Sequence, residues 1–195
     1  RQLSRDVRDG EPQHVALLEV AQLVHEPLGV VAQGGAFARE LAPLLARAAR
    51  LAGLAVHAPV FLSNHYHLLV SVTDAQQLAE FMNYLNSNLA REAGRLVRWR
   101  EKFWGRRFQA VLVSDEEEAQ VGRLSYLLAQ GVKEGLVASP FDWPGVHCAR
   151  ALSEGTTVSG RWHDRTLESK ARRKGLPPDP QAFVEREELS LAPLP

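Results

Sequence analysis

The chain has 195 residues, 45% hydrophobic and 24% charged, as expected for an ordinary globular protein of one domain with an extension. Its 23 basic and 23 acidic residues balance, which counts against a general nucleic-acid binder, and its one cysteine excludes an internal disulfide and any multi-cysteine zinc site. No apolar run is long enough to span a bilayer and no signal peptide is visible, so we expect a cytoplasmic protein with no membrane contact.

The chain opens with a strand pattern followed by a helix pattern. Residues 14–20 form an apolar run that predicts a buried strand, and residues 28–32 predict a short second strand. Apolar residues at helical spacing then predict a helix to about Leu51, which Gly53 ends. Pro43 either begins this helix or bends it.

Residues 56–72 predict an interrupted strand that carries a histidine pair. Its alternation places Tyr66 and every second residue up to Val72 on one apolar face, which we expect to be core. His65 and His67, at i and i+2, share the other face, which is left for chemistry. Because a lone pair of this kind is more often structural than metal-binding, it needs support from elsewhere in the chain.

Two more helices and a strand complete the pattern. Asp74 caps a helix that runs to about Gly94, and residues 108–113 predict a strand. Ser114 and Glu117 form a capping box for the next helix. The order of elements predicts an α+β sandwich of the ferredoxin-like type, in which helices pack on a single antiparallel-type sheet.

The last of these helices combines a buried stripe with a polar pair. Apolar residues within one narrow arc predict the stripe, which consists of Val121, Leu124, Leu128 and Val132. Tyr126 and Gln130, at i and i+4, lie roughly opposite this arc, so the tyrosine is not expected to serve the core. Two imidazoles, an amide oxygen and a phenol could together build a metal-assisted nucleophilic site.

A basic and aromatic segment precedes the last strand. Between Arg91 and Arg107 there are seven basic residues and two acidic ones. Aromatic residues interleaved with arginines favour contact with bases and phosphates. The residues expected to contact nucleic acid are Arg98, Arg100, Lys102, Trp104, Arg106 and Arg107.

Residues 151–195 contain little apolar periodicity and several prolines. We therefore expect a domain of residues 1–150 followed by an extended, partly basic tail. The tail should wrap over the domain rather than form a second core.

Four short stretches resemble the single-tyrosine HUH transposases, and within them the REP-associated tyrosine transposases. The similar stretches are residues 64–70 ("N-H-x-H-L-L"), 103–108 ("W-Q-G-R-F"), 126–137 ("Y-I-x-x-N-P-V-x-x-G-L-V") and 142–144 ("D-Y/W-P"). They occur in the family's order within residues 13–150. Gly131 stands where the family has proline.

The resemblance implies an HUH fold and a transposase that cleaves and joins single-stranded DNA. By position, Tyr126 is the nucleophile that forms a 5′-phosphotyrosine intermediate. His65, His67 and Gln130 are the ligands of a divalent metal, Mg²⁺ or Mn²⁺. The implied partner is single-stranded or hairpin DNA, in the cytoplasm at a prokaryotic nucleoid, and we favour a monomer over a homodimer.

Two alternatives stay open. A domesticated protein would bind a DNA hairpin without cutting it, which the balanced charge and Gly131 favour. A metal-dependent phosphodiesterase would use the tyrosine only to position water. A covalent adduct on a denaturing gel separates the transposase hypothesis from both.

Overall fold

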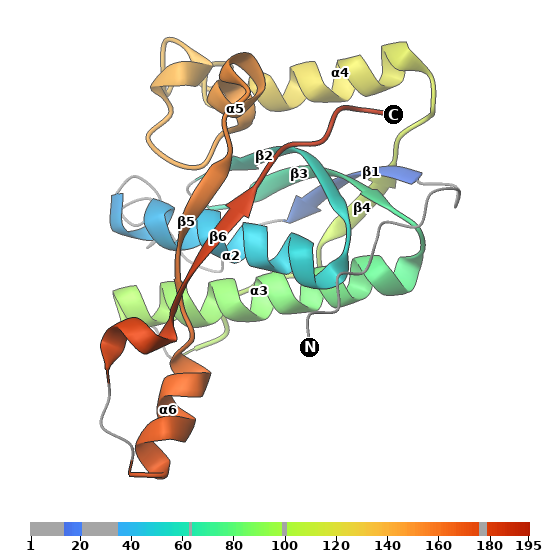
Figure 1. Cartoon of the computed structure of the whole chain (residues 1–195). Coiled ribbons are helices and arrows are strands. Elements are labelled where there is room, and N and C mark those ends of the chain that lie inside the picture. Colours follow the sequence, from blue (N-terminus) through green and yellow to red (C-terminus); the bar gives the residue numbers. More distant parts are fainter. Residues whose placement is uncertain (1–13, 21–34, 63, 99–100, 176–178) are drawn as a thin grey trace.

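A four-stranded antiparallel sheet, with strands in the order β2-β3-β1-β4, forms the centre of the fold (Figure 1). The computed structural model describes residues 14–20, 35–62, 64–98, 101–175 and 179–195. The strands are β1 (His14–Val20), β2 (Ala55–Phe61), β3 (Tyr66–Val72) and β4 (Gln109–Leu112). The expected α+β class with one antiparallel sheet is therefore confirmed. The expected strand at residues 28–32 lies outside the described residues.

Helices cover both faces of this sheet. Helices α2 (Gly35–Ala52) and α3 (Ala75–Val97) pack on one face, and α4 (Glu117–Leu128) packs on the other (Figure 1). Pro43 lies inside α2 and not at its start. Gly53 ends α2 as expected, with a φ of 66° and its N–H donated to the Ala49 carbonyl at 2.8 Å.

The α2/α3 face holds the larger hydrophobic cluster. Tyr66, Leu68 and the other alternate residues of β3 are buried there against side chains such as Leu45, Phe81 and Leu85. The alternation read from the sequence is therefore confirmed on this face. Each such side chain contributes about 1.5–3 kcal/mol on burial, so most of the stability comes from this layer.

The opposite face is also covered. Leu17 and Leu69 of the sheet pack there with Leu127 of α4, and His67 is only 1% exposed. Strand alternation had left the histidine face for chemistry, with Tyr126 and Gln130 of the last helix expected to reach it. It is buried because α4 lies across it, which strand alternation alone does not reveal.

The caps of the helices were predicted with mixed success. Asp74 caps α3 as expected, since its carboxylate accepts the Gln77 N–H at 2.7 Å. The capping box expected for α4 is not formed. Glu116 is its N-cap without a side-chain bond, and the Ser114 hydroxyl accepts the Glu116 N–H at 3.2 Å.

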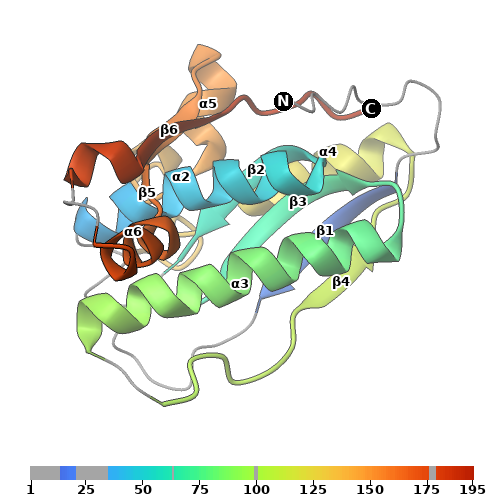
Figure 2. The same ribbon diagram turned by 60° about the horizontal axis from the view of Figure 1, so that its bottom comes forward.

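The C-terminal segment is structured and is not the extended tail that we expected. Strands β5 (Val158–His163) and β6 (Val184–Leu189) form an antiparallel pair that lies against α2 (Figure 2). We call this pair the C-terminal hairpin, although α6 lies in the connection between its strands. The remaining elements are α5 (Cys148–Glu154), α6 (Arg165–Arg173) and the short 3₁₀ helices Pro140–Asp142 and Pro180–Phe183. Trp162 and Leu189 belong to the α2/α3 cluster, so the hairpin extends the core of the domain.

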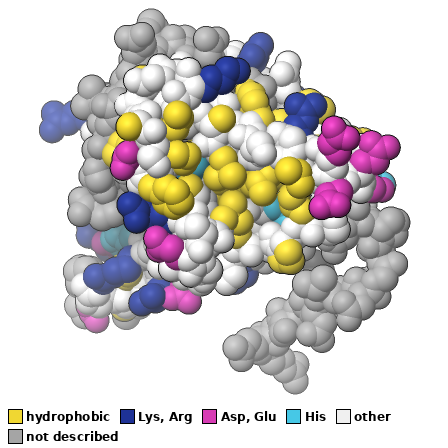
Figure 3. Space-filling view, turned by 90° about the horizontal axis from the view of Figure 1, so that it is seen from above, with side chains coloured by type: hydrophobic (Ala, Val, Ile, Leu, Met, Phe, Trp, Pro, Cys, Tyr) yellow, Lys and Arg dark blue, Asp and Glu magenta, His cyan; other side chains and the backbone are white. Residues whose placement is uncertain are grey.

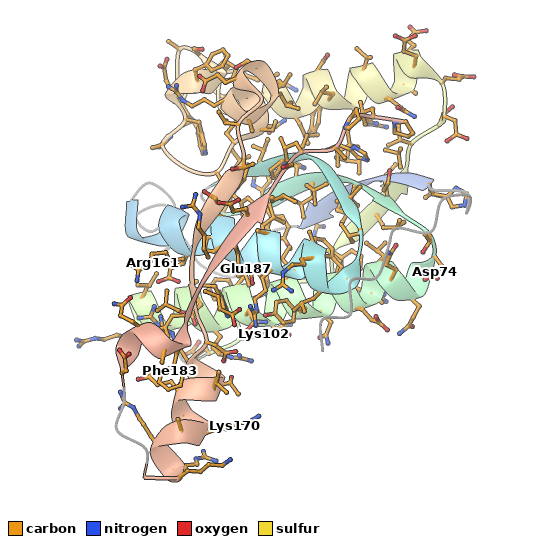
Figure 4. The ribbon with its side chains drawn as sticks, viewed as in Figure 1. Asp74, Lys102, Arg161, Lys170, Phe183 and Glu187 are labelled. Carbon is orange, nitrogen blue, oxygen red and sulfur yellow. The ribbon has the colours of Figure 1, made fainter. Side chains whose placement is uncertain are left out.

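Ion pairs fix this hairpin to α2. Glu187 of β6, which is labelled in Figure 4, is 4% exposed and accepts hydrogen bonds from Arg47 and Arg50 at 2.6 Å each. Burial alone would raise the pKa of Glu187, but Arg50 and Arg47 hold it below its usual value. Sequence periodicity missed the segment because its attachment depends on these charges and a few apolar contacts.

Among the described residues, no helix is both long and apolar enough to cross a membrane.

Candidate active site

A tight turn between β2 and β3 presents the histidine pair. The Leu62 N–H donates to the His65 carbonyl at 2.9 Å, so His65 lies in the turn and only His67 lies in β3. The sequence had placed both on one strand. The two rings are nevertheless adjacent, with centroids 4.9 Å apart and planes at 90°.

The neighbouring Asn64 defines how the His65 ring is held. The Nδ1 atom of His65 lies 2.6 Å from the Oδ1 atom of Asn64. Since an amide oxygen can only accept, Nδ1 carries the proton and Nε2 has the lone pair. A hydrogen bond of this kind to one ring nitrogen is the usual way to orient an imidazole that ligates a metal through its other nitrogen.

Helix α4 brings Tyr126 to this pair. The rings of His67 and Tyr126 are 5.6 Å apart between centroids, at an interplanar angle of 82°. Tyr126 is 38% exposed, so its ring contacts the histidine while part of it reaches solvent. Lys133 places its ammonium group 5.9 Å from the centre of the Tyr126 ring.

The buried side of α4 matches the predicted stripe only in part, because Leu124 and Leu128 pack against the cluster on this face and the other two stripe residues do not. Val121 is 49% exposed, whereas Gln120 and Leu127 are buried. Val132 cannot continue a stripe because the helix ends at Leu128. Leu127 follows Tyr126 by one residue, or about 100° of helix rotation. Tyr126 therefore lies on the flank of α4, next to the sheet, and not opposite its buried side.

Gln130 lies beyond the end of α4, but its side chain points back to the backbone of Tyr126. Its side chain is 3% exposed and donates through Nε2 to the Tyr126 carbonyl at 3.3 Å. This bond uses the amide N–H and leaves the amide oxygen as the available acceptor. Tyr126 and Gln130 are therefore adjacent, as their i, i+4 spacing predicted. They are held together by a turn and a side-chain hydrogen bond and not by one continuous helix.

A glycine and a tryptophan hold this turn, and the sequence analysis had given neither a role. Gly131 has a φ of 83°, and a Cβ atom on it would lie 2.8 Å from the Trp143 ring. Trp143 also donates its indole N–H to the Phe61 carbonyl at 3.0 Å. Trp143 therefore links the turn after α4 to the end of β2, just before the histidine turn. The "D-W-P" stretch was the available signal.

The donors in this cluster suit a divalent ion. In the described part of the chain, no three His, Cys, Asp or Glu side chains form a metal-binding group, so an amide would have to complete the set. His65, His67 and Gln130 supply two imidazoles and an amide oxygen, which is a donor set for a borderline or hard cation.

The predicted nucleic-acid segment lies beside α3. Arg98 is the C-cap of α3, with a φ of 55°, and Arg100 lies outside the described residues. Lys102 is exposed and donates to the Gly105 carbonyl at 3.4 Å. Trp104 is half-buried, with its indole N–H donated to the Asn86 carbonyl at 3.0 Å, so its ring is fixed against α3.

A hollow of about 380 Å³ lies between side chains of this segment and side chains of α3. Trp104 and Phe108 form part of its wall, and the exposed Arg106 and Arg107 lie along it. The Arg107 guanidinium lies 5.3 Å from the Phe108 ring centre, a cation–π distance. Exposed arginines next to aromatic side chains suit the binding of a nucleotide, because its base can stack on a ring and its phosphate can pair with an arginine.

The surface around α4 has a different character. Figure 3 shows apolar side chains over this face and acidic ones gathered at the end where α4 begins. The exposed acids there are Asp115, Glu116, Glu117 and Glu118. Their charge would repel a phosphate backbone from that end of α4.

Part of the chain is similar to a known class of protein, the IS200-like transposases. Residues 31–126, just under half of the chain, match the model of the family described as "Transposase IS200 like". The matched region ends at Tyr126. A search of curated proteins gives no match.

Two solved structures are similar to the chain. One is a REP-associated tyrosine transposase bound to a REP hairpin, with 16% identity and a TM-score of 0.58, covering 77% of this chain and 86% of that one. The other is a protein from Deinococcus radiodurans R1 described as a candidate transposase, with 19% identity and a TM-score of 0.44, covering 65% of this chain and 97% of that one. At this identity the first similarity shows the fold.

Proposed function

We propose that this protein is a metal-dependent transposase that cleaves and joins single-stranded DNA, including hairpin DNA, through a 5′-phosphotyrosine at Tyr126. The observation that carries the proposal is the ring contact between His67 and Tyr126, with His65 adjacent and Gln130 bonded to the backbone of Tyr126. Residues from two distant parts of the chain, 65–67 and 126–130, meet here outside the main core. A structural role alone gives no reason for this combination.

The chemistry follows from the residue types. The Tyr126 oxygen would attack the scissile phosphorus, the bond to the 3′ oxygen would break, and the phenol proton would end on the released 3′-hydroxyl. Attack by another 3′-hydroxyl reverses the step and joins strands without an external energy source. His65, His67 and Gln130 would hold Mg²⁺ or Mn²⁺, which when bound polarises the phosphate and stabilises developing negative charge.

DNA would be held by the segment beside α3. Arg98, Arg106 and Arg107 are exposed cations, and Trp104 is a fixed aromatic wall. Replacing Arg106 and Arg107 with glutamine should weaken DNA binding and reduce its salt slope by about one unit per lost phosphate contact. An unchanged slope would move the DNA surface elsewhere. Arg100 and Lys102 belong to the same proposed surface.

The proposed oligomeric state is a monomer. Both partners of the His67–Tyr126 contact belong to the same copy, so no second copy is needed to bring the tyrosine to the histidines. The proposed location is the cytoplasm, at the nucleoid of a prokaryote.

A non-cleaving hairpin-binding protein is the second candidate function. One observation favours it: His67 is 1% exposed, so a metal must reach an imidazole that α4 covers. A metal-dependent phosphodiesterase, with Tyr126 positioning water, differs from the first proposal in leaving no covalent product.

One assay separates these functions. The full chain is incubated with a labelled single-stranded hairpin DNA and Mg²⁺ or Mn²⁺, and the products are run on a denaturing gel. We expect a protein–DNA adduct that disappears in Tyr126→Phe while DNA binding is retained. Tyr84→Phe is the matched control, because Tyr84 is half-buried on α3, away from the histidines, and should leave the adduct unchanged.

Each other result identifies a different function. Cleaved DNA without an adduct indicates the phosphodiesterase, and binding without cleavage indicates the hairpin-binding protein. His65→Ala and His67→Ala should abolish metal-dependent cleavage, and Gln130→Ala should slow it and weaken metal affinity.

A further inference from the structure

A second basic hollow lies on the other side of α3 from the predicted DNA segment. It has a volume of about 760 Å³ and is enclosed by side chains of α2, α3, the end of β5, and α6. Five arginine or lysine side chains and two carboxylates line it. This groove belongs to the α2/α3 side of the sheet, while His67 and Tyr126 meet on the α4 side.

Both carboxylates of the groove are already engaged. Glu92 accepts from Arg95 at 3.0 Å and from Arg165 at 3.1 Å. Asp164 caps α6 by accepting the Leu167 N–H at 2.8 Å, and it lies 3.7 Å from Arg47. Within the groove, the two acids therefore pair with Arg165 and Arg47.

Three cations on the outer wall are left without a counter-charge. Lys170 and Arg173, three residues apart on α6, and Arg91 on α3 make no ion pair with any residue that the structure describes. Arg91 has only a neutral partner, the Asn88 side-chain oxygen at 3.1 Å. Figure 4 shows Lys170 projecting from α6. Like charges gathered in one groove repel each other unless an anion joins them.

The ridge of α3 connects this groove to the hollow at Trp104. Asn83, Asn86 and Ser87 line the Trp104 hollow, while Asn88 and Arg91 line the basic groove. From residue 83 to residue 91 the helix contains no carboxylate. Amide, hydroxyl and guanidinium groups along one ridge are the donors that phosphate oxygens accept from.

We infer that this groove binds the phosphodiester backbone of DNA, at a stretch beyond the one that reaches the histidine–tyrosine site. The strand would pass from Arg106 and Arg107 over the ridge of α3 to Arg91, Lys170 and Arg173. The inference goes beyond the proposed function because it needs no cleavage. It gives the C-terminal segment, which sequence periodicity had left without a structure, a role in holding DNA.

The test compares two double variants of α6 that remove equal charge. Lys170→Gln with Arg173→Gln changes the groove. Arg172→Gln with Lys174→Gln is the matched control, since neither residue lines the groove and Arg172 is paired with Glu168 at 2.6 Å. Both are made in the full-length Tyr126→Phe chain, so that binding is measured without cleavage.

The probe is a fluorescein-labelled DNA hairpin with long single-stranded flanks, and anisotropy is followed across a salt series. The groove variant should bind about five- to tenfold more weakly, with a salt slope lower by roughly 0.7 per lost phosphate contact, and the control should change less than about twofold. A hairpin without flanks should bind both variants equally. Equal losses in the two variants, or no loss in either, would overturn the inference.

Two further measurements keep the result interpretable. The flanked DNA should protect Lys170 but not Lys174 from acetylation in the unmodified chain, which needs no variant to fold. Polyglutamate should not displace the DNA at equal charge concentration. Equal acetylation of the two lysines, or efficient displacement by polyglutamate, would contradict a site for a DNA backbone.

Discussion

The two faces of the sheet differ in the kind of side chains that they bury. The α2/α3 face has a large apolar layer, in which Leu85 and Phe81 are completely buried, and the carboxylates buried on that side, Glu92 and Glu187, are paired with arginines. The α4 face has a smaller cluster and contains buried polar side chains, including His67 and Gln130. Because buried polar groups cost stability, the contrast teaches that the first face supports the fold and the second holds the proposed chemistry.

The largest expected effect breaks the supporting face. Leu85→Ala should lower the free energy of unfolding by about 2–5 kcal/mol, because it leaves a cavity in the main core. The matched change on α4, Val121→Ala, should alter it by less than about 0.5 kcal/mol, since Val121 is 49% exposed. Urea unfolding of both variants measures the difference. Similar losses would mean that α4 buries the side predicted from the sequence.

The turn behind the site should be the next most sensitive element. Gly131→Ala should cost about 1–3 kcal/mol, because its positive φ and the Trp143 ring leave no room for a Cβ atom. Gly135→Ala is the control: its φ is also positive, but no atom lies within 4 Å of its Cβ position. Thermal denaturation should therefore show a larger loss at residue 131. Equal losses of stability in the two variants would mean that backbone strain alone, and not the Trp143 contact, causes the destabilisation.

Two tyrosines sharpen the comparison between the faces. Tyr66 is 2% exposed and donates to the Asn86 side-chain oxygen at 2.8 Å, so Tyr66→Phe should destabilise by about 1–2 kcal/mol. Tyr126→Phe should change stability by less than about 0.5 kcal/mol while removing the covalent adduct. Chemical denaturation and the adduct assay give both quantities, and a stability cost at Tyr126 would indicate a structural role.

The smallest effect concerns pH. Burial lowers the pKa of His57, despite its bond to the Ala192 carbonyl. The neutral ring is satisfied at both nitrogens, with Ser71 2.8 Å from Nε2. Because the unfolded chain takes up the proton first, stability should be complete above about pH 6.5 and fall as the pH drops below that value. Melting temperatures from pH 8 to pH 5 should show this decline, less steeply in His57→Gln. If the melting temperature of His57→Gln declined equally steeply, another titratable group would be responsible for the effect.

Much of the fold could be predicted from the sequence because its signals are local. The alternation of β3, the cap at Asp74 and the stop at Gly53 all depend on the preferences of a few neighbouring residues. The C-terminal hairpin could not be predicted in this way. Its attachment depends on Glu187 meeting Arg47 and Arg50, which are far away in the sequence.

The candidate site divides along the same line. The sequence by itself determined which residue types stand at short spacings: the histidines at i and i+2, and Tyr126 with Gln130 at i and i+4. Backbone geometry turns such spacings into proximity within one element. The meeting of Tyr126 with the histidine pair was also expected, but only the tertiary structure decided that Tyr126 reaches His67 from the flank of its helix and that Trp143 fixes the turn at Gly131. Those contacts join distant segments, and they depend on how whole elements pack, which no local pattern encodes.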